Sequence, residues 1–443
     1  MSSQVYQFGE KMSEVALSAG DTAWVLASSA LVLLMTPGLA FFYGGMVRAK
    51  SALNMMMMSM VTIGVVSVLW VIYGFKLAFG YEANSQWYGS LSLSGLGDAV
   101  NELTNNGGIY PIPLLVFATF QLMFAIITPA LISGAIADRA KFVSWTIFVA
   151  LWVTLVYFPV AHWVFAFGNK VGDTVTGAGF LAARGVEDFA GGTAVHINAG
   201  AAGLALAIVL GRRIGWQKSP MRPHSLPLVL LGAGLLWFGW FGFNAGSALG
   251  ANATAGLAFI NTQVATAGAL LGWIMTEKFR DGHPTSLGAA SGAVAGLVAI
   301  TPACAFVAPW AAVVIGFLAG VICALAVGLK YKFGYDDALD VVGVHLVGGI
   351  VGSLAIGFFG SSKVNSLGLD GLFYGGGTTL LGKQALGVGL VMTYSFVMTL
   401  IIGFLIEKTI GFRVKSEKEL AGVDLTEHAE SAYEMGGILR GGR

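Results

Sequence analysis

Charged residues are scarce in this sequence. Asp, Glu, Lys and Arg make up only 11% of its 443 residues, whereas a soluble domain carries about 25%. Hydrophobic residues make up 56%. Many apolar runs reach the roughly 20 residues that a helix needs to cross a bilayer. This composition excludes a soluble domain and predicts an all-α polytopic membrane protein, embedded in lipid in the cell membrane.

Other kinds of residue pattern are also missing. The two cysteines, Cys304 and Cys323, give no disulfide framework and no metal cluster, so both are expected to be ordinary core residues. No basic cluster with interleaved aromatics occurs, and the net charge is only +1, so nucleic acid is not an expected partner. Without a nucleophile–base set or a metal motif, we expect no enzyme activity, no metal and no cofactor.

The apolar runs predict eleven membrane-spanning helices. Cytoplasmic loops carry an excess of Lys and Arg, and 18 of the 24 basic residues fall on one side of these spans. The N-terminus is therefore expected outside and the C-terminus in the cytoplasm. We expect an extracytoplasmic segment at 1–20, a transmembrane transporter domain at 21–410 and a cytoplasmic tail at 411–443. The predicted spans are 22–45, 52–78, 112–136, 143–168, 189–211, 225–249, 255–276, 286–303, 309–329, 339–360 and 384–407.

Two of these spans carry the same histidine pattern. His196 is followed by Gly200 and Gly203, and His345 is followed by glycines at the same spacing. The first pattern lies in span five and the second in span ten, which run in opposite directions. The chain therefore reads as two inverted five-helix repeats plus a final helix, an arrangement found in many transporters.

An acidic residue precedes each histidine. At 1.5 Å per residue, His196 lies about 12 Å along its helix from Asp188, and His345 about 8 Å from Asp340. Because the two helices enter from opposite faces, the rings are expected to meet within hydrogen-bond distance. Packing of each histidine against a neighbouring helix, or ligation of a haem by the pair, are the alternatives. Asp188 and Asp340 are both interpreted as helix caps. Direct contact with substrate is a second interpretation for Asp188.

Aromatic side chains lie at helical spacing in two other spans. Phe120 and Phe124 share one helix face, and Trp240, Phe243 and Ser247 share another. Such stripes are more often packing than function. They gain a role where they face a cation, because a desolvated cation–π contact is worth ~2 kcal/mol or more.

Several segments together resemble the ammonium transporter family (the Amt/Mep/Rh superfamily), in its Amt branch. They are Gly20 to Trp24, Pro37 to Gly45, Asp188 to Asn198, Trp240 to Ser247 and Asp340 to Gly352. The resemblance covers residues 20–435, and its most specific piece is D-F-A-G-G-T-A-V-H-I-N. It implies a homotrimer with one conduction pathway in each subunit, which carries ammonium or ammonia, with methylammonium as an analogue.

The resemblance also implies roles for individual residues. A phenylalanine gate falls on Phe120 or Phe124 together with Phe243, and the twin histidines of the pore fall on His196 and His345. An outer recruitment site falls on Phe120 and Ser247, near Trp240 and Asp188. The tryptophan that the family has in this site is replaced by Phe165, while Trp163 lies two residues too early and should face elsewhere.

Physical chemistry supports the same pathway. An isolated charge is very costly to move through an apolar lumen, whereas neutral ammonia is not. Aromatic faces and a hydroxyl are expected to compensate part of this cost at the entrance, and ammonium is expected to lose its proton deeper in. The histidine pair then offers a proton relay, and transport is expected to be electrogenic. A passive gas channel for ammonia or carbon dioxide, as in the Rh branch, and an ammonium sensor are the alternatives.

The C-terminal tail carries a further resemblance. Gly422 to His428 and Ser431 to Tyr433 are similar to the segment with which the family's members dock onto their inner face and communicate with P-II signal proteins. A disordered tail is the alternative. The resemblance predicts that this segment regulates transport.

Overall fold

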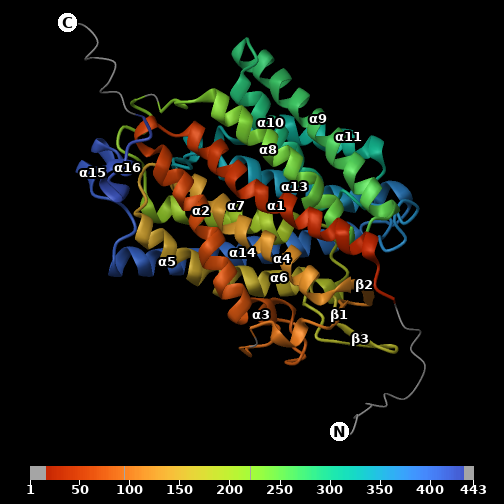
Figure 1. Ribbon diagram of the computed structural model, residues 1–443. Coiled ribbons are helices and arrows are strands. Elements are labelled where there is room, and N and C mark those ends of the chain that lie inside the picture. Colours follow the sequence, from red (N-terminus) through yellow and green to blue (C-terminus); the bar gives the residue numbers. More distant parts are fainter. Residues whose placement is uncertain (1–15, 94, 220, 434–443) are drawn as a thin grey trace, which may run out of the picture.

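The computed structural model describes residues 16–93, 95–219 and 221–433. Helices make up most of it (Figure 1). In this part of the chain, ten helical segments are long and apolar enough to cross a membrane. They are Ala19–Met46, Ala49–Phe79, Leu114–Ile136, Phe142–Phe165, Gly192–Leu210, Leu226–Ala248, Ala253–Asp281, Pro309–Phe333, Val342–Phe359 and Thr379–Thr409. The prediction of a polytopic helical membrane protein is confirmed.

Several of these segments are built from shorter helices. Five-residue π-helical turns join α2 to α3 and α5 to α6, and two further π-helical turns carry the histidines. The α-helices are α1 (Ala19–Met46), α2 (Ala52–Leu69), α3 (Phe75–Phe79), α4 (Leu114–Ile132), α5 (Phe142–Trp152), α6 (Phe158–Phe165), α7 (Asn198–Leu210), α8 (Leu226–Ala245), α9 (Ala253–Asp281), α10 (Ser286–Ile300), α11 (Pro309–Ala326), α12 (Leu329–Phe333), α13 (Val347–Phe359), α14 (Thr379–Thr409), α15 (Ser416–Ala421) and α16 (Val423–His428).

The eighth predicted span is the shortest. It appears as α10, whose 15 residues extend only about 22 Å, less than the roughly 30 Å of a bilayer core. Nearly all of its side chains are buried, and it packs against α8, α9, α11 and α13. Helix α10 therefore lies inside the bundle along most of its length, from Gly288 to Ile300.

The expectation of a purely helical chain is wrong in one respect. Two short antiparallel hairpins lie in the loops, one of β1 (Leu103–Asn105) with β2 (Ile109–Pro113) and one of β3 (Asn169–Val171) with β4 (Thr174–Thr176). Gly107 and Gly172 stand in their turns with positive φ, a conformation that glycine adopts without strain. Strands of three to five residues are too short to show a period-2 pattern in the sequence.

Helices α1 and α8 form the most extensive contact and join the two halves of the fold. They run antiparallel. A Cβ at Gly246 would meet Ser28, one at Gly239 would meet Met35, and one at Gly232 would lie 2.3 Å from the backbone nitrogen of Phe42. Small residues thus allow the two backbones to approach closely, as is common between membrane helices.

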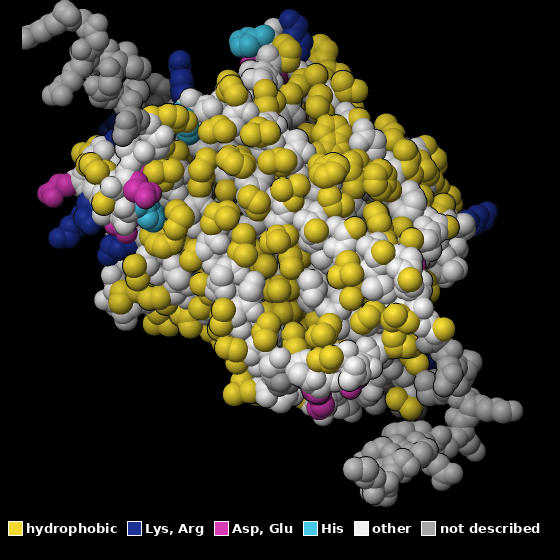
Figure 2. Space-filling model, viewed as in Figure 1, with side chains coloured by type: hydrophobic (Ala, Val, Ile, Leu, Met, Phe, Trp, Pro, Cys, Tyr) yellow, Lys and Arg dark blue, Asp and Glu magenta, His cyan; other side chains and the backbone are white. Residues whose placement is uncertain are grey.

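The surface of the bundle is apolar across its middle. Figure 2 shows hydrophobic side chains spread over one broad face, with charged side chains near its edges. Leu33, Val68, Phe238 and Leu271 are examples of large apolar side chains that are more than one third exposed. Such a surface is stable in lipid, where exposed apolar area carries no penalty.

Candidate functional site

The two histidines lie together in the interior. Nδ1 of His196 and Nδ1 of His345 are 3.3 Å apart, and the ring centroids lie 5.4 Å apart at an interplanar angle of 20°. Both side chains are buried. The prediction that the rings approach within hydrogen-bond distance is confirmed.

Both histidines sit in the same kind of local structure. His196 lies in the π-helical turn η7 (Gly192–Ile197), which leads into α7, and His345 lies in η9 (Val342–Leu346), which leads into α13. Each of these α-helices has 13 residues. The sequence repeat therefore corresponds to a structural repeat.

The glycine four residues after each histidine lets the two helices cross. A Cβ at Gly200 would lie 2.4 Å from the backbone nitrogen of Leu346, and one at Gly349 would lie 3.0 Å from the carbonyl oxygen of Gly192. Neither position has room for a side chain without a shift of backbone atoms. These glycines therefore bring the histidine rings into contact.

Asp188 caps the first histidine segment. Its carboxylate accepts hydrogen bonds from the backbone N–H groups of Gly191, Gly192 and Thr193 and from the Thr193 hydroxyl. The interpretation of Asp188 as a helix cap is confirmed. Because both oxygens are engaged in this cap, it offers little capacity for direct contact with substrate.

The interpretation of Asp340 as the matching cap is wrong. Asp337 accepts from the backbone N–H groups of Val341 and Val342, at 3.1 and 2.7 Å. Asp340 instead forms an ion pair with Lys330, with 2.6 Å between Nζ and Oδ1, and has a positive φ of 63°. Asp337 precedes His345 by eight residues, as Asp188 precedes His196, and this equal spacing could have identified it from the sequence.

The surroundings of Asp337 are charged. Burial raises the pKa of its carboxyl to about 6; the nearby Lys330 lowers this pKa and the nearby Asp340 raises it. Its neighbour Asp336 accepts two hydrogen bonds from the Arg213 guanidinium, at 2.8 and 2.9 Å. Arg213 also pairs with Asp138.

Aromatic rings connect one end of the interior to the histidines. The ring centroids of Phe120 and Phe124 lie 4.9 Å apart, and those of Phe124 and Phe243 lie 4.3 Å apart. The ring centroid of Phe243 lies in turn 6.1 Å from that of His196. The rings therefore form a continuous series from Phe120 to His345.

Trp240 belongs to the histidine pair rather than to the outer end of this series. Its ring stacks on His196, with centroids 5.4 Å apart and 20° between the planes. Its Nε1 donates to Thr301 Oγ1 at 2.8 Å, which fixes the indole. The sequence gave no indication of the Thr301 contact.

Other candidates for the outer site lie at different places. Ser247 is partly buried and its hydroxyl donates to the carbonyl of Phe243. Phe165 is buried, and no described ring contact joins it to Phe120. Trp163 faces elsewhere, as predicted, because its Nε1 donates to the carbonyl of Trp87 and its ring packs on Tyr394.

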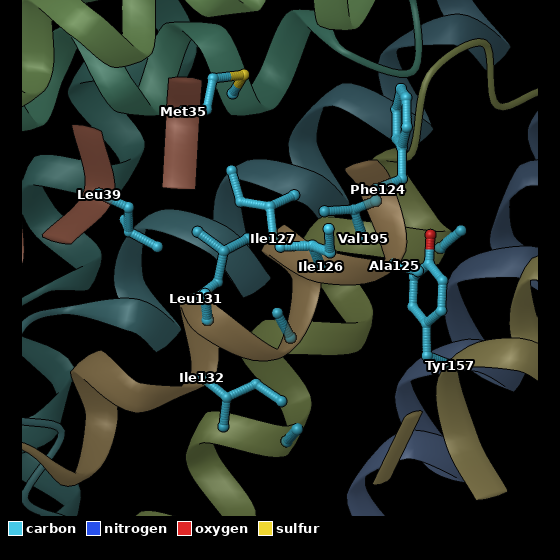
Figure 3. Close-up of a cluster of buried hydrophobic side chains, with 14 of the residues drawn as sticks. Met35, Leu39, Phe124, Ala125, Ile126, Ile127, Leu131, Ile132, Tyr157 and Val195 are labelled. Atoms are coloured by element: carbon cyan, nitrogen blue, oxygen red, sulfur yellow. The ribbon is translucent and has the colours of Figure 1, made fainter. Parts of the chain in front are cut away.

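A small cavity of about 10 Å³ adjoins the histidine pair. Figure 3 shows Leu39 of α1 and Ile127 and Leu131 of α4 pointing into the same space. The cavity is close to the minimum size for one water molecule. In the described part of the chain, Nε2 of His196 is buried without a hydrogen-bond partner. The lining is Met35, Leu39, Phe42, Ile127, Leu131, Val195, His196, Leu236, Trp240, Phe243, Val294 and His345.

This arrangement fits a narrow conduction path. Its walls are apolar, two imidazoles supply its polar atoms, and aromatic rings lie at one end. Neutral imidazole has one donor and one acceptor nitrogen. The site can therefore hold one small hydrogen-bonding molecule at a time and transfer a proton along the ring pair.

Known proteins resemble this chain in sequence. The sequence profile of the Ammonium Transporter Family matches residues 23–433. An ammonium transporter of Mycobacterium tuberculosis is 56% identical over 94% of this chain and 90% of its own length. One of Bacillus subtilis is 45% identical over 94% of this chain and 99% of its own length.

Solved structures resemble it as well. Saccharomyces cerevisiae Mep2 superposes with a TM-score of 0.83 at 32% identity, over 96% of this chain and 93% of its own. A protein described as a sensor Amt protein superposes with a TM-score of 0.82 at 29% identity, over 92% and 98%. From sequence and fold together, this chain belongs to the Ammonium Transporter Family: it is a multi-pass protein of the cell membrane that transports ammonium, and it is not an enzyme.

Proposed function

We propose that this protein takes up ammonium at an outer aromatic site, removes a proton and conducts ammonia past the twin histidines. The observation that carries the proposal is the 3.3 Å contact between His196 and His345 in an otherwise apolar lining. A pair of bare imidazoles in an apolar passage is costly unless each serves as a partner for the other or for a passing molecule.

The outer site and the gate lie in order along the ring series. Phe120 and Ser247 form the recruitment site, with the phenyl face and the hydroxyl oxygen compensating part of the lost hydration of the cation. Phe124 and Phe243, whose rings are in contact, form the gate. Trp240 acts deeper, as the stacking partner that orients His196.

Proton transfer follows from the chemistry of the pair. With the two Nδ1 atoms in contact, one neutral ring donates and the other accepts. Since moving the bare cation costs tens of kcal/mol in the Born limit, the proton travels along the imidazoles while ammonia moves past the walls. Transport by this route is electrogenic, because a charge crosses with each ammonia.

Replacement of the histidines tests the mechanism. In proteoliposomes, His196→Ala and His345→Ala should each abolish most of the ammonium-evoked current while leaving ammonia diffusion measurable by internal pH. His196→Asp should admit hydrated cations and raise potassium leak. A wild-type-like, ammonium-selective current in both alanine variants would sink the relay.

The rival functions give different results in the same liposomes. A passive gas channel carries ammonia or carbon dioxide with no current, so an ammonium-dependent pH change without current favours it. A sensor function is raised by the likeness to the sensor Amt protein. It predicts ammonium binding without turnover of methylammonium.

The proposal includes eleven spans, with α10 as the eighth, two inverted five-helix repeats, and three such subunits in a homotrimer. The start of α1 and the tail helices α15 and α16 lie at opposite ends of the bundle (Figure 1), which supports an extracytoplasmic N-terminus and a cytoplasmic C-terminus. We keep the boundaries 1–20, 21–410 and 411–443 for the three parts. Residues 1–15 and 434–443 of the first and last parts lie outside the described residues.

The tail is proposed to regulate transport and to bind a P-II signal protein at the cytoplasmic face. Three of its carboxylates engage backbone N–H groups of the transmembrane part. Asp424 accepts from Leu53 and Asn54 at the start of α2. Glu427 accepts from Phe142 at the start of α5, and Glu419 accepts from Ile214 after α7. Movement of the tail would therefore remove the acceptors of N–H groups at the starts of α2 and α5 and in the loop after α7.

Deletion of residues 413–443 tests this role. We expect reduced or unregulated transport with the trimer intact, measured by methylammonium uptake and by size-exclusion chromatography. A triple variant of Glu419, Asp424 and Glu427 to alanine, which removes the accepting oxygens, separates loss of these contacts from loss of the whole segment. Unchanged transport and unchanged P-II binding after the deletion would remove the idea.

A further inference from the structure

Three helices each present a lining residue to the cavity and, two turns away, a residue at the outer end of the path. On α1, Ser28 lies seven residues before Met35; on α4, Phe120 lies seven residues before Ile127. Ser247 lies seven residues after Trp240, in the short 3₁₀ turn Gly246–Ala248 that continues α8. Residues seven apart share a helix face about 10 Å apart. Ser28, Phe120 and Ser247 therefore continue the three lining stripes to the same level.

Ser28 and Phe120 also approach each other. A Cβ at Gly246 would lie 2.8 Å from Oγ of Ser28 and 2.9 Å from Cε2 of Phe120. Gly246 immediately precedes Ser247 in the chain. The lack of a side chain at Gly246 thus brings a hydroxyl of α1, a phenyl ring of α4 and the end of α8 together.

The hydroxyl of Ser28 is one of several buried hydroxyls without a partner among the described residues, and it is the one that lies beside Phe120. Its residue is fully buried, and within the described residues its Oγ forms no hydrogen bond. Buried hydroxyls are normally paired. The adjacent Ser29 follows this rule, because its Oγ donates to the carbonyl of Val25 at 2.8 Å.

We propose that Ser28 is a substrate-binding residue, whose oxygen is the second hydroxyl acceptor for the ammonium ion beside Phe120. The inference rests on the outer recruitment site proposed above and adds a residue to it. Ammonium has four N–H donors and no acceptor. Ser247 donates its hydroxyl hydrogen to Phe243, which leaves its lone pairs for the ion, and Ser28 offers lone pairs from the opposite helix. The phenyl face of Phe120 supplies the third contact.

The test is the concentration dependence of ammonium-evoked current in proteoliposomes. We expect Ser28→Ala to raise the apparent KM about tenfold, since a hydrogen bond to a charged group has about this effect, with the maximal current unchanged. Ser29→Ala is the matched control and should keep the wild-type KM, because its hydroxyl bonds within its own helix. A wild-type KM in Ser28→Ala overturns the inference.

A second pair of variants removes the effect of packing. Ser28→Thr and Ser28→Val add the same bulk, but only threonine keeps the hydroxyl. The inference requires a lower KM for threonine than for valine, and equal values overturn it. Thermal stability without ammonium should not fall in Ser28→Ala, because no bond within the protein is lost. If the wild-type protein itself shows no ammonium-dependent flux, the proposed function fails. If the wild-type protein shows this flux and the Ser28 variants keep the wild-type KM, only the inference fails.

Discussion

The two histidine segments share their geometry and differ in their electrostatics. In each, an aspartate caps a π-helical turn eight residues before the histidine, and a glycine follows four residues after it. Asp188 bonds to backbone N–H groups and a hydroxyl, and no described ion pair includes it. Asp337 lies instead beside Lys330 and Asp340.

This difference separates two requirements. The placement of each ring requires the cap, the π-helical turn and the close helix crossing, and both halves keep all three. The charge around the cap is not needed to place a ring, so it differs between the two ends of the path. We therefore expect loss of a cap or a crossing glycine to lower stability in either half. Removal of a charge near the cap should matter only in the second half.

Loss of the first cap should have the largest effect. Asp188→Ala removes the acceptor of four backbone N–H groups and of the Thr193 hydroxyl in a buried region. At about 1–3 kcal/mol for each unpaired group, we expect a loss of about 5 kcal/mol or failure to fold. Thermal unfolding in detergent measures it. Asp337→Ala, which frees only two N–H groups, should be milder; an equal or greater loss would contradict the comparison.

The crossing glycines should come next. Gly200→Ala places a Cβ 2.4 Å from the backbone nitrogen of Leu346, whereas the nearest backbone atom to a Cβ at Gly349 is the carbonyl oxygen of Gly192 at 3.0 Å. The closer approach at Gly200 requires the larger shift of backbone. We expect Gly200→Ala to cost about 3 kcal/mol and most of the current, with a smaller loss in Gly349→Ala. Stability and current should be measured on both, and the reverse order would refute this reading.

The charge around Asp337 should appear as a pH dependence. Its pKa is raised to about 6 in the folded protein from about 4 in an unfolded chain. The stabilisation from its proton is fully present below about pH 4 and is lost as the pH rises through 6. The loss is at most about 3 kcal/mol for a shift of about two units. Asp337→Asn, which cannot ionise, should therefore gain stability relative to wild type between pH 4.5 and 8.

Asp336→Asn is the control for this pH dependence. Burial alone would raise the pKa of Asp336, but its hydrogen bond to Arg213 and the charges of Arg139 and Arg213 lower it below its usual value. The stability that ionised Asp336 contributes is lost only in more acidic solution. The difference in free energy of unfolding between Asp336→Asn and wild type should therefore stay constant between pH 4.5 and 8. A flat difference for Asp337→Asn as well would remove the role of its charged surroundings.

The smallest effect should come from the hydroxyl of the first cap. Thr193 lies five residues after Asp188, and the equivalent position after Asp337 is Val342. Thr193→Val makes the first half like the second and removes one hydrogen bond to a carboxylate, which is worth about 1–2 kcal/mol. We expect this loss in thermal unfolding with the current nearly unchanged. A loss as large as that of Asp188→Ala would show that the hydroxyl dominates the cap.

The sequence predicted the framework and the central pair because both depend on local patterns. Long apolar runs located the spans, and the repeated histidine–glycine spacing located the ring contact between His196 and His345. The residue at which each helix ends was predicted less accurately. The 15-residue α10, for example, was predicted three residues too long, because a helix buried in protein ends without a change in polarity.

The contacts between distant segments were not predictable in the same way. Asp340 was chosen as a cap because it is the acid nearest to His345, yet the chain places Asp337 at the helix start and turns Asp340 toward Lys330. The stacking of Trp240 on His196 depends on how α8 packs beside η7. No local spacing specifies such a contact, since the two residues lie on different helices.

The contact between the Phe124 and Phe243 rings has a kinetic consequence. With centroids 4.3 Å apart, the rings leave no space for a molecule between them, and the cavity behind them holds at most one small guest. On the path proposed above, every passage requires a ring rotation, a thermally activated event that is slower in a packed interior than at a surface. Flux through such a path saturates at the frequency of ring opening, and it rises more steeply with temperature than diffusion through an open pore.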